Sequence, residues 1–144
     1  MKVVSEDSSV SIRYMLSADA CIQIIENSPI TLLQRLAQCR AGEIGVSAIT
    51  VAELSLWAAH SRTFVKTNEA LRHFLQMLPV LYFDESAATI YGTTKIGVEQ
   101  TGATMETLDV LIAAHAISLN ATYVTDRNAV FEGLKKLRTE DWSR

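Results

Sequence analysis

The sequence predicts an α/β domain in three layers, with a mainly parallel sheet flanked by helices on both faces. Short β-type runs alternate along the whole chain with segments whose apolar residues recur at helical spacing. The 144 residues are enough for one domain whose core needs no disulfide. In sheets of this type, ligands collect at the carboxyl ends of the strands.

The first half of the chain predicts two strands and four helices. Pro29 separates the first two helices, because a helix rarely continues through the residue before a proline. Gly42 is expected just past the end of the second helix, and Ser47 or Thr50 can cap the third. In order, we expect a strand at 14–16, helices from about Cys21 and at 30–39, a strand at 43–47, and helices at 51–60 and 68–77.

The second half predicts three strands and three helices. Asp84 to Ser86 open one helix, which Gly102 ends, and Thr107 is a good cap for the next helix, which is strongly apolar. A polar turn follows the β-type run before Asp126. In order, we expect strands at 80–83, 122–125 and 137–142, and helices at 87–100, 108–119 and 129–134.

Composition narrows the function classes. Residues 1–12 are polar and serine-rich, so they are expected to form a leader before a single domain at 13–144. The chain has no apolar run long enough for a bilayer and no signal-peptide block, which predicts a cytoplasmic protein without membrane contact. A net charge of −3 argues against coating nucleic acid by bulk electrostatics, but not against a nuclease. Cys21 and Cys39 form no metal or redox motif and are expected to be buried thiols.

Four acids fall at the predicted ends of strands or near the starts of helices: Asp19, Glu53, Asp109 and Asp126. The α/β topology would bring all four to one edge of the sheet. Clustered carboxylates repel one another and need a cation, and hard oxygen ligands favour Mg²⁺ or Mn²⁺. Taken singly, each acid has a structural alternative as a turn, cap or solvated helix residue.

Three segments carry a resemblance to a known family. Residues 108–116 (LDVLIAAHA) resemble the conserved helix of VapC-type PIN-domain toxins, residues 123–126 resemble the strand that follows it, and residues 50–54 resemble the family's T-x-x-E-L segment. Single residues also match the family pattern, namely Tyr91, Gly92, Gly102, Phe131, Leu134 and Trp142.

The resemblance implies a PIN fold and a Mg²⁺- or Mn²⁺-dependent endoribonuclease, with RNA as its substrate and transfer RNA among the candidates. It also implies a homodimer, and inhibition by a small VapB-like antitoxin encoded beside the toxin. Glu53, Asp109 and Asp126 match the family's acidic set, which also includes an aspartate after the first strand.

That first aspartate is where the chain departs from the family. The family usually reads L-D-T-N or L-D-T-D, whereas this chain reads Leu16-Ser17-Ala18-Asp19. Ser17 therefore stands in the place of the first catalytic aspartate. Three interpretations remain open: Asp19 substitutes from the same side of an extended segment, the chain is an inactive or engineered variant, or it is a natural relative that has lost most activity. We favour retained metal binding with weakened catalysis.

Three further residues are candidates for substrate binding. Lys95 stands where relatives often carry an arginine, Arg127 can contact the RNA backbone, and the Thr125 hydroxyl can orient a ligand or water. Each has an ordinary alternative as a surface or strand residue. His115 lies within an apolar helix and is expected in the core or an interface rather than on a metal.

Two competing functions remain. A PIN-like domain without its first aspartate could be a non-catalytic module that binds antitoxin or RNA. A receiver-type signalling domain is also α/β with clustered acids, but it needs an acidic pair after its first strand and a lysine after its last.

Overall fold

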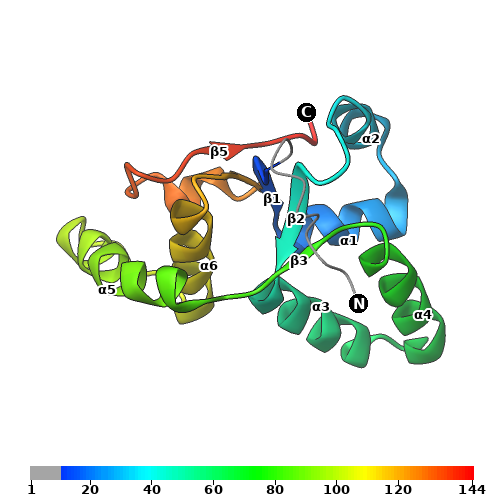
Figure 1. Ribbon diagram of the computed structural model, residues 1–144. Coiled ribbons are helices and arrows are strands. Elements are labelled where there is room, and N and C mark those ends of the chain that lie inside the picture. Colours follow the sequence, from blue (N-terminus) through cyan, green and yellow to red (C-terminus); the bar gives the residue numbers. More distant parts are fainter. Residues whose placement is uncertain (1–10) are drawn as a thin grey trace.

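The structure, a computed structural model, describes residues 11–144 (Figure 1). Most of the predicted leader at 1–12 lies outside these residues, so the predicted domain boundary stays a prediction. Five parallel strands form one sheet in the order β3-β2-β1-β4-β5. The elements are β1 (Tyr14–Leu16), α1 (Ala18–Asn27), α2 (Ile30–Ala37), β2 (Ile44–Ser47), α3 (Ala48–His60), α4 (Phe64–Leu75), β3 (Val80–Leu81), α5 (Glu85–Gln100), α6 (Thr107–Ser118), β4 (Thr122–Val124), the 3₁₀ turn η1 (Asn128–Phe131) and β5 (Thr139–Glu140).

The two central strands divide the core between the two faces of the sheet. In the parallel register Met15 pairs with Tyr123, and Leu16 pairs with Val124. Successive strand residues point to opposite faces, so the first pair packs with α5 and α6, and the second with α1, α3 and α4. Figure 1 shows these two groups of helices on either side of the sheet. The predicted three-layer fold is therefore confirmed.

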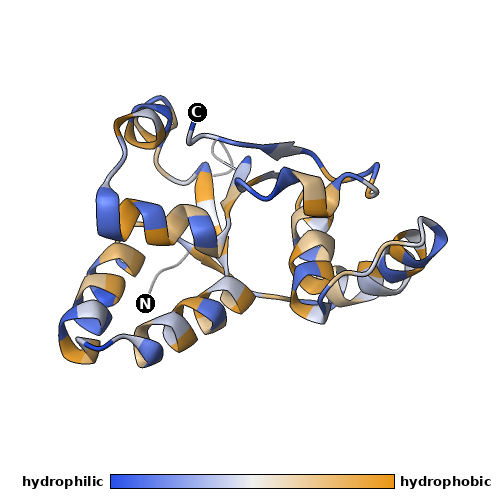
Figure 2. Cartoon of the chain, turned by 180° about the vertical axis from the view of Figure 1, so that it is seen from behind, coloured by the Kyte–Doolittle hydropathy of each residue, from blue (hydrophilic) through white to orange (hydrophobic). Residues whose placement is uncertain are grey.

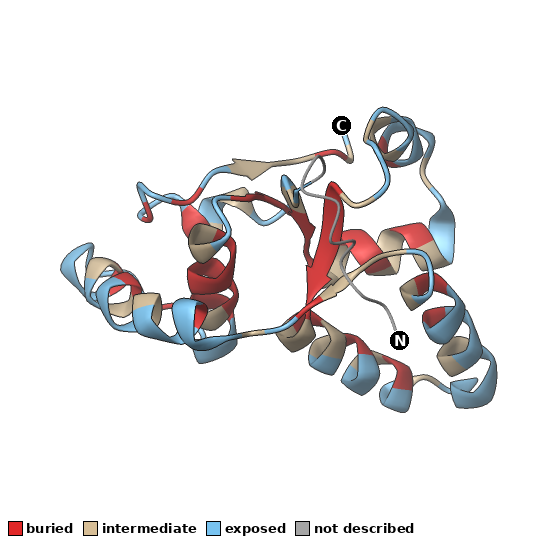
Figure 3. Cartoon of the chain, viewed as in Figure 1, coloured by how far each residue is buried: buried red, intermediate tan, exposed pale blue. Residues whose placement is uncertain are grey.

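Helix α6 is the most completely buried element. Residues 112–116 are all shielded from solvent, and α6 lies between the sheet and α5 (Figure 3). Its surface is apolar nearly all round, whereas α1 and α4 alternate between polar and apolar faces (Figure 2). A helix that is apolar on every side must be covered on every side, and this fixes the position of the acid in its first turn.

Several predicted boundaries differ from the observed ones. Helix α4 begins at Phe64, whereas the sequence predicted a start near Asn68. The prediction missed the first turn because Phe64 and Val65 are apolar but exposed, so they do not follow the helical pattern of buried residues. Helix α2 ends at Ala37, and Gly42, at φ 89°, belongs to the turn before β2 rather than to the helix end. Among the described residues, none of the helices is both long and apolar enough to cross a bilayer.

The start of α6 also differs from the prediction. Thr107 is the first residue of the helix, and Glu106 is its N-cap, without a side-chain capping bond. Helix α5 follows the prediction more closely, because the Asp84 carboxylate accepts the Ala87 N–H at 3.1 Å.

Candidate active site

The central strands end in buried polar side chains. Ser17 follows β1, Ser47 ends β2 and Thr125 follows β4, and each is at most 1% exposed. The Ser17 N–H donates to the Val124 carbonyl at 2.9 Å, so the ends of β1 and β4 are joined. The carboxyl edge of the sheet is therefore lined with hydroxyl groups, at the place where this fold class binds ligands.

Ser17 begins a helix rather than extending the strand. Its Oγ accepts the Ala20 N–H at 3.1 Å and caps α1. Asp19 is therefore in the first turn of α1, and the expectation that Ser17 and Asp19 lie on an extended segment is wrong. The helix begins at Ala18 because the serine satisfies a free N–H group of its first turn.

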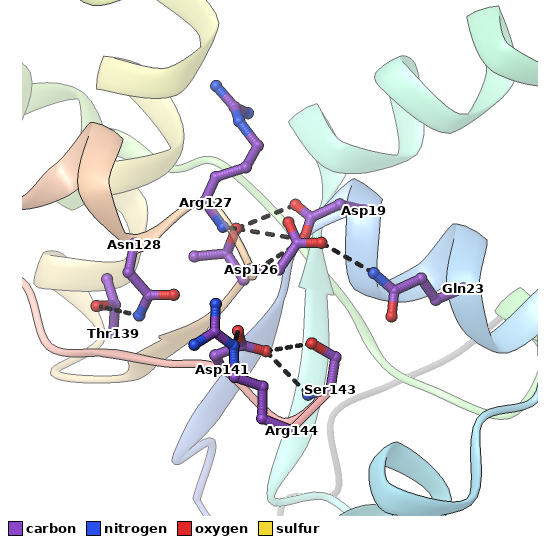
Figure 4. Close-up of polar contacts among 10 residues, drawn as sticks. Asp19, Gln23, Asp126, Arg127, Asn128, Thr139, Asp141, Ser143 and Arg144 are labelled. Atoms are coloured by element: carbon purple, nitrogen blue, oxygen red, sulfur yellow. Dashed lines mark hydrogen bonds and ion pairs between the residues drawn. The ribbon is translucent and has the colours of Figure 1, made fainter.

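The Asp19 carboxylate holds the loop after β4. Oδ1 accepts the Thr125 hydroxyl at 3.1 Å, and Oδ2 accepts the Asp126 N–H at 3.0 Å. Gln23, one turn after Asp19 on α1, donates its Nε2 to Asp126 Oδ2 at 3.0 Å (Figure 4). A side-chain hydrogen bond with Asp19, then burial and the Asp19 charge, raise the pKa of Asp126. Asp19 and Asp126 thus form one carboxyl pair.

Asp109 is the most deeply buried acid of the site. It lies in the first turn of α6 and is 5% exposed. The Arg127 guanidinium grips both of its oxygens, with Nη1–Oδ1 at 3.3 Å and Nη2–Oδ2 at 2.9 Å. The Arg127 N–H in turn donates to Thr125 Oγ1 at 3.0 Å. Arg127 was predicted to contact substrate, and here its side chain is paired with an acid of the site.

Glu53 faces the same cluster from α3. Burial raises its pKa first, the charge of Asp109 raises it further, and the positive charge of Arg127 lowers it. Its carboxylate forms no hydrogen bond or ion pair within residues 11–144, which leaves its oxygens open. The fold brings together four acids and one cation, namely Asp19, Glu53, Asp109, Asp126 and Arg127.

The chemistry of this donor set fits a hard divalent cation. Every acidic group in it offers carboxylate oxygens, which Mg²⁺ and Mn²⁺ prefer. Over residues 11–144, however, no three acidic, histidine or cysteine side chains already stand in an arrangement that holds a metal. Asp109 is paired with Arg127, and Asp19 is turned toward the β4 loop. The residues therefore fit a metal by type, and binding would require these contacts to rearrange.

Two other predicted residues take no part in this cluster. Lys95 is half-buried on α5 and forms no hydrogen bond or ion pair with the described residues. His115 is 1% exposed, and its Nδ1 lies 2.8 Å from Ser47 Oγ. The Phe83 ring packs edge-on against it at 5.5 Å. His115 is therefore a core residue, as predicted, and its contact with Ser47 also joins α6 to the end of β2.

Sequence reasoning missed Gln23. The available signal was its spacing of one helical turn from Asp19, which puts both side chains on the same face of α1. The cysteines are both free, with Cys21 buried and Cys39 half-buried.

Comparison with known proteins agrees with the fold. The PIN domain model matches residues 14–137. Ribonuclease VapC2 of Haemophilus influenzae is 34% identical over 131 residues, 91% of this chain and 98% of the relative. The tRNA(fMet)-specific endonuclease VapC of Shigella flexneri is 31% identical over 132 residues, 92% of this chain and 99% of the relative.

Solved structures give the same answer. The crystal structure of VapBC2 from Rickettsia felis bound to a promoter DNA fragment has a chain that matches with a TM-score of 0.83 and 31% identity, covering 91% of this chain and 99% of that one. DNA-bound VapBC from Salmonella typhimurium matches with a TM-score of 0.85 and 29% identity, covering 91% and 98%. The chain therefore belongs to the PIN-domain family, and within it to the VapC group.

Proposed function

We propose that this chain is a metal-dependent endoribonuclease that hydrolyses RNA phosphodiester bonds and acts as the toxin of a toxin–antitoxin pair. One observation carries the proposal: acids from α1, α3, α6 and the β4 loop converge at the carboxyl edge of the sheet. The VapC relatives, which match over nine-tenths of this chain, are named as ribonucleases.

The residues have distinct roles in this proposal. Glu53, Asp109 and Asp19 would hold Mg²⁺ or Mn²⁺, with Asp126 beside them at the solvent-exposed rim. Such an ion, once held by these acids, would supply activation of a water and neutralisation of charge on the scissile phosphate. The Thr125 hydroxyl orients the Asp19 carboxylate through the hydrogen bond that it donates. Lys95 and Arg127 place the RNA backbone by contacts to phosphate.

Ser17 weakens this site relative to an aspartate. Its hydroxyl already accepts the Ala20 N–H, and it is fully buried. A neutral hydroxyl is a poorer ligand for a hard cation than a carboxylate. We therefore expect slower cleavage than in a VapC protein with an aspartate at this position.

The relatives also suggest substrate and partners. The Shigella flexneri relative is named as a tRNA(fMet)-specific endonuclease, so transfer RNA is the first substrate to test. The similar solved structures are VapBC complexes, which supports a VapB-like antitoxin as the inhibitor. We further propose a homodimer that works in the cytoplasm.

The test is cleavage of labelled transfer RNA by the purified protein with Mg²⁺, Mn²⁺ or EDTA. Cleavage that requires the divalent ion and is lost in Asp109→Asn supports the proposal. Cleavage that continues in EDTA, or in Asp109→Asn, rejects it. Ser17 is the one observation that favours the competing function, a non-catalytic binding module. If the chain is such a module, it should bind RNA or antitoxin without cleaving RNA, and cleavage should appear only in Ser17→Asp.

A further inference from the structure

The Arg127–Asp109 pair places a cation of the chain itself on the acid that a metal needs. We propose that Arg127 is a built-in counter-cation: its guanidinium and a divalent ion compete for the Asp109 carboxylate, and the metal binds Asp109 only after Arg127 leaves. This inference rests on the proposed function, because it concerns how the same site takes up its metal.

The geometry of the pair supports competition. Both Asp109 oxygens are engaged by separate guanidinium nitrogens, and two parallel charge-assisted bonds are among the stronger polar contacts in proteins. Asp109 is buried, and a buried carboxylate without a partner is costly. The carboxylate therefore needs either Arg127 or another cation.

Arg127 is also able to leave. Its side chain is 44% exposed, against 7% for that of Asp109, so the guanidinium has water beside it. The loop backbone does not need to move, because the Arg127 N–H is held by Thr125 Oγ1 and the Asp126 N–H by Asp19. A rotation of the side chain alone would free Asp109.

The charge of Arg127 acts on the rest of the cluster. Its positive charge lowers the pKa of Glu53, which burial and the Asp109 charge raise. Within residues 11–144, removing this charge leaves no cation paired with Asp109, Glu53 or Asp19. The acids would then attract a divalent ion more strongly.

The test is a titration of the 144-residue chain with Mn²⁺, in which electron paramagnetic resonance measures the free ion. We expect Arg127→Ala to bind Mn²⁺ roughly five- to tenfold more tightly than the original chain, as loss of a competing, partly exposed ion pair implies. Arg127→Lys keeps the charge but loses the fork, and is expected to fall between the two.

The matched control is Arg138→Ala. Arg138 is also an exposed arginine with side-chain partners, but it bonds Asn120 and Thr122 at the opposite end of β4. Arg138→Ala removes the same charge from the molecule as Arg127→Ala but leaves the acidic cluster intact, so Mn²⁺ affinity should not change. Equal gains in Arg138→Ala and Arg127→Ala would assign the effect to net charge and overturn the inference.

A thermal unfolding series gives a second readout that does not need activity. Without metal, Arg127→Ala should unfold at a lower temperature than the original chain, because Asp109 loses its partner, and Mn²⁺ should raise its Tm more than that of the original chain. In the Asp109→Asn background, Arg127→Ala should raise Mn²⁺ affinity less than it does in the original chain, because only the charge effect of Arg127 on Glu53 remains.

The outcomes separate this inference from the proposed function. Unchanged Mn²⁺ affinity in a folded Arg127→Ala protein overturns the competition, and metal-dependent cleavage by the original chain would still support the nuclease. If Mn²⁺ binds neither protein, the competition is also rejected, and the cleavage assay in EDTA then decides the proposed function by itself.

Discussion

The carboxyl ends of β1 and β2 are alike in local structure but differ in the groups around them. Ser17 after β1 and Ser47 at the end of β2 are both fully buried and both cap the following helix. Ser47 also bonds His115 and ties the end of β2 to α6. The end of β1, in contrast, borders the acids of α1, α6 and the β4 loop.

The difference shows that a helix-capping serine at the end of a strand can support core packing in one place and a functional site in another. A serine at the end of a parallel strand satisfies the first turn of the next helix in both cases. At β2 the second partner is a core histidine, His115, whose pKa is lowered by burial, so the contact fixes packing. At β1 the surrounding groups are charged and partly open to solvent, so the contact fixes the position of possible metal ligands.

The largest effect is expected at the end of β1, where the acids cluster. Asp109→Asn removes the deepest acid of the cluster, and we expect RNA cleavage to fall at least about 100-fold, in line with the loss of a main electrostatic group from an active site. Initial rates on labelled transfer RNA measure it. Glu99→Gln, an exposed acid on α5, is the control and should keep the full rate.

The next prediction concerns the end of β2. His115→Ala removes a buried ring and its bond to Ser47, and should lower the free energy of unfolding by about 2–4 kcal/mol. Urea unfolding measures the change, and His60→Ala, at the exposed end of α3, should shift it by less than about 0.5 kcal/mol. A small loss in His115→Ala would mean that the contact between β2 and α6 is not structural.

A third pair of substitutions tests whether Ser17 and Ser47 differ in their effect on metal binding. Asp caps a helix as well as Ser, so Ser17→Asp should keep α1 while adding a carboxylate to the acidic cluster. We expect Mn²⁺ affinity to rise by about tenfold or more, measured by calorimetry. The same substitution at the other strand end, Ser47→Asp, places the carboxylate beside His115 and should leave Mn²⁺ affinity unchanged; equal gains at both positions would refute the distinction.

The smallest effect concerns the pKa of Glu53. Burial and the Asp109 charge raise it in the folded state, so the folded protein binds more protons than the unfolded one between the two pKa values. Stability from this group is therefore present below the unfolded pKa and is lost as the pH rises through the folded pKa. Glu53→Gln should be more stable than the original chain near neutral pH, by less than about 1 kcal/mol because the group is half-exposed, and the difference should vanish below about pH 4.

Much of the fold was predictable, because it depends on patterns that are local in sequence. The alternation of strands and helices gave the parallel sheet, and Asp84 and Pro29 marked helix boundaries where the structure has them. Boundaries failed where local chemistry competes. Ser17 caps a helix instead of extending a strand, and exposed Phe64 and Val65 hide the start of α4.

The site was predictable in its acids but not in its contacts. Asp19, Glu53, Asp109 and Asp126 stand out because each follows a strand or lies early in a helix. The Arg127–Asp109 pair joins residues from α6 and from the loop after β4. No sequence period relates them, because only tertiary packing sets their distance.

Anomalous scattering from Mn²⁺ in crystals of this protein would locate the ion and test whether the acids at the carboxyl edge of the sheet form a metal site. We expect one or two peaks at the carboxyl edge of the sheet, with Asp109 and at least one of Glu53, Asp19 and Asp126 among the ligands. Peaks only at other surfaces, in crystals of a protein that cleaves RNA, would contradict it.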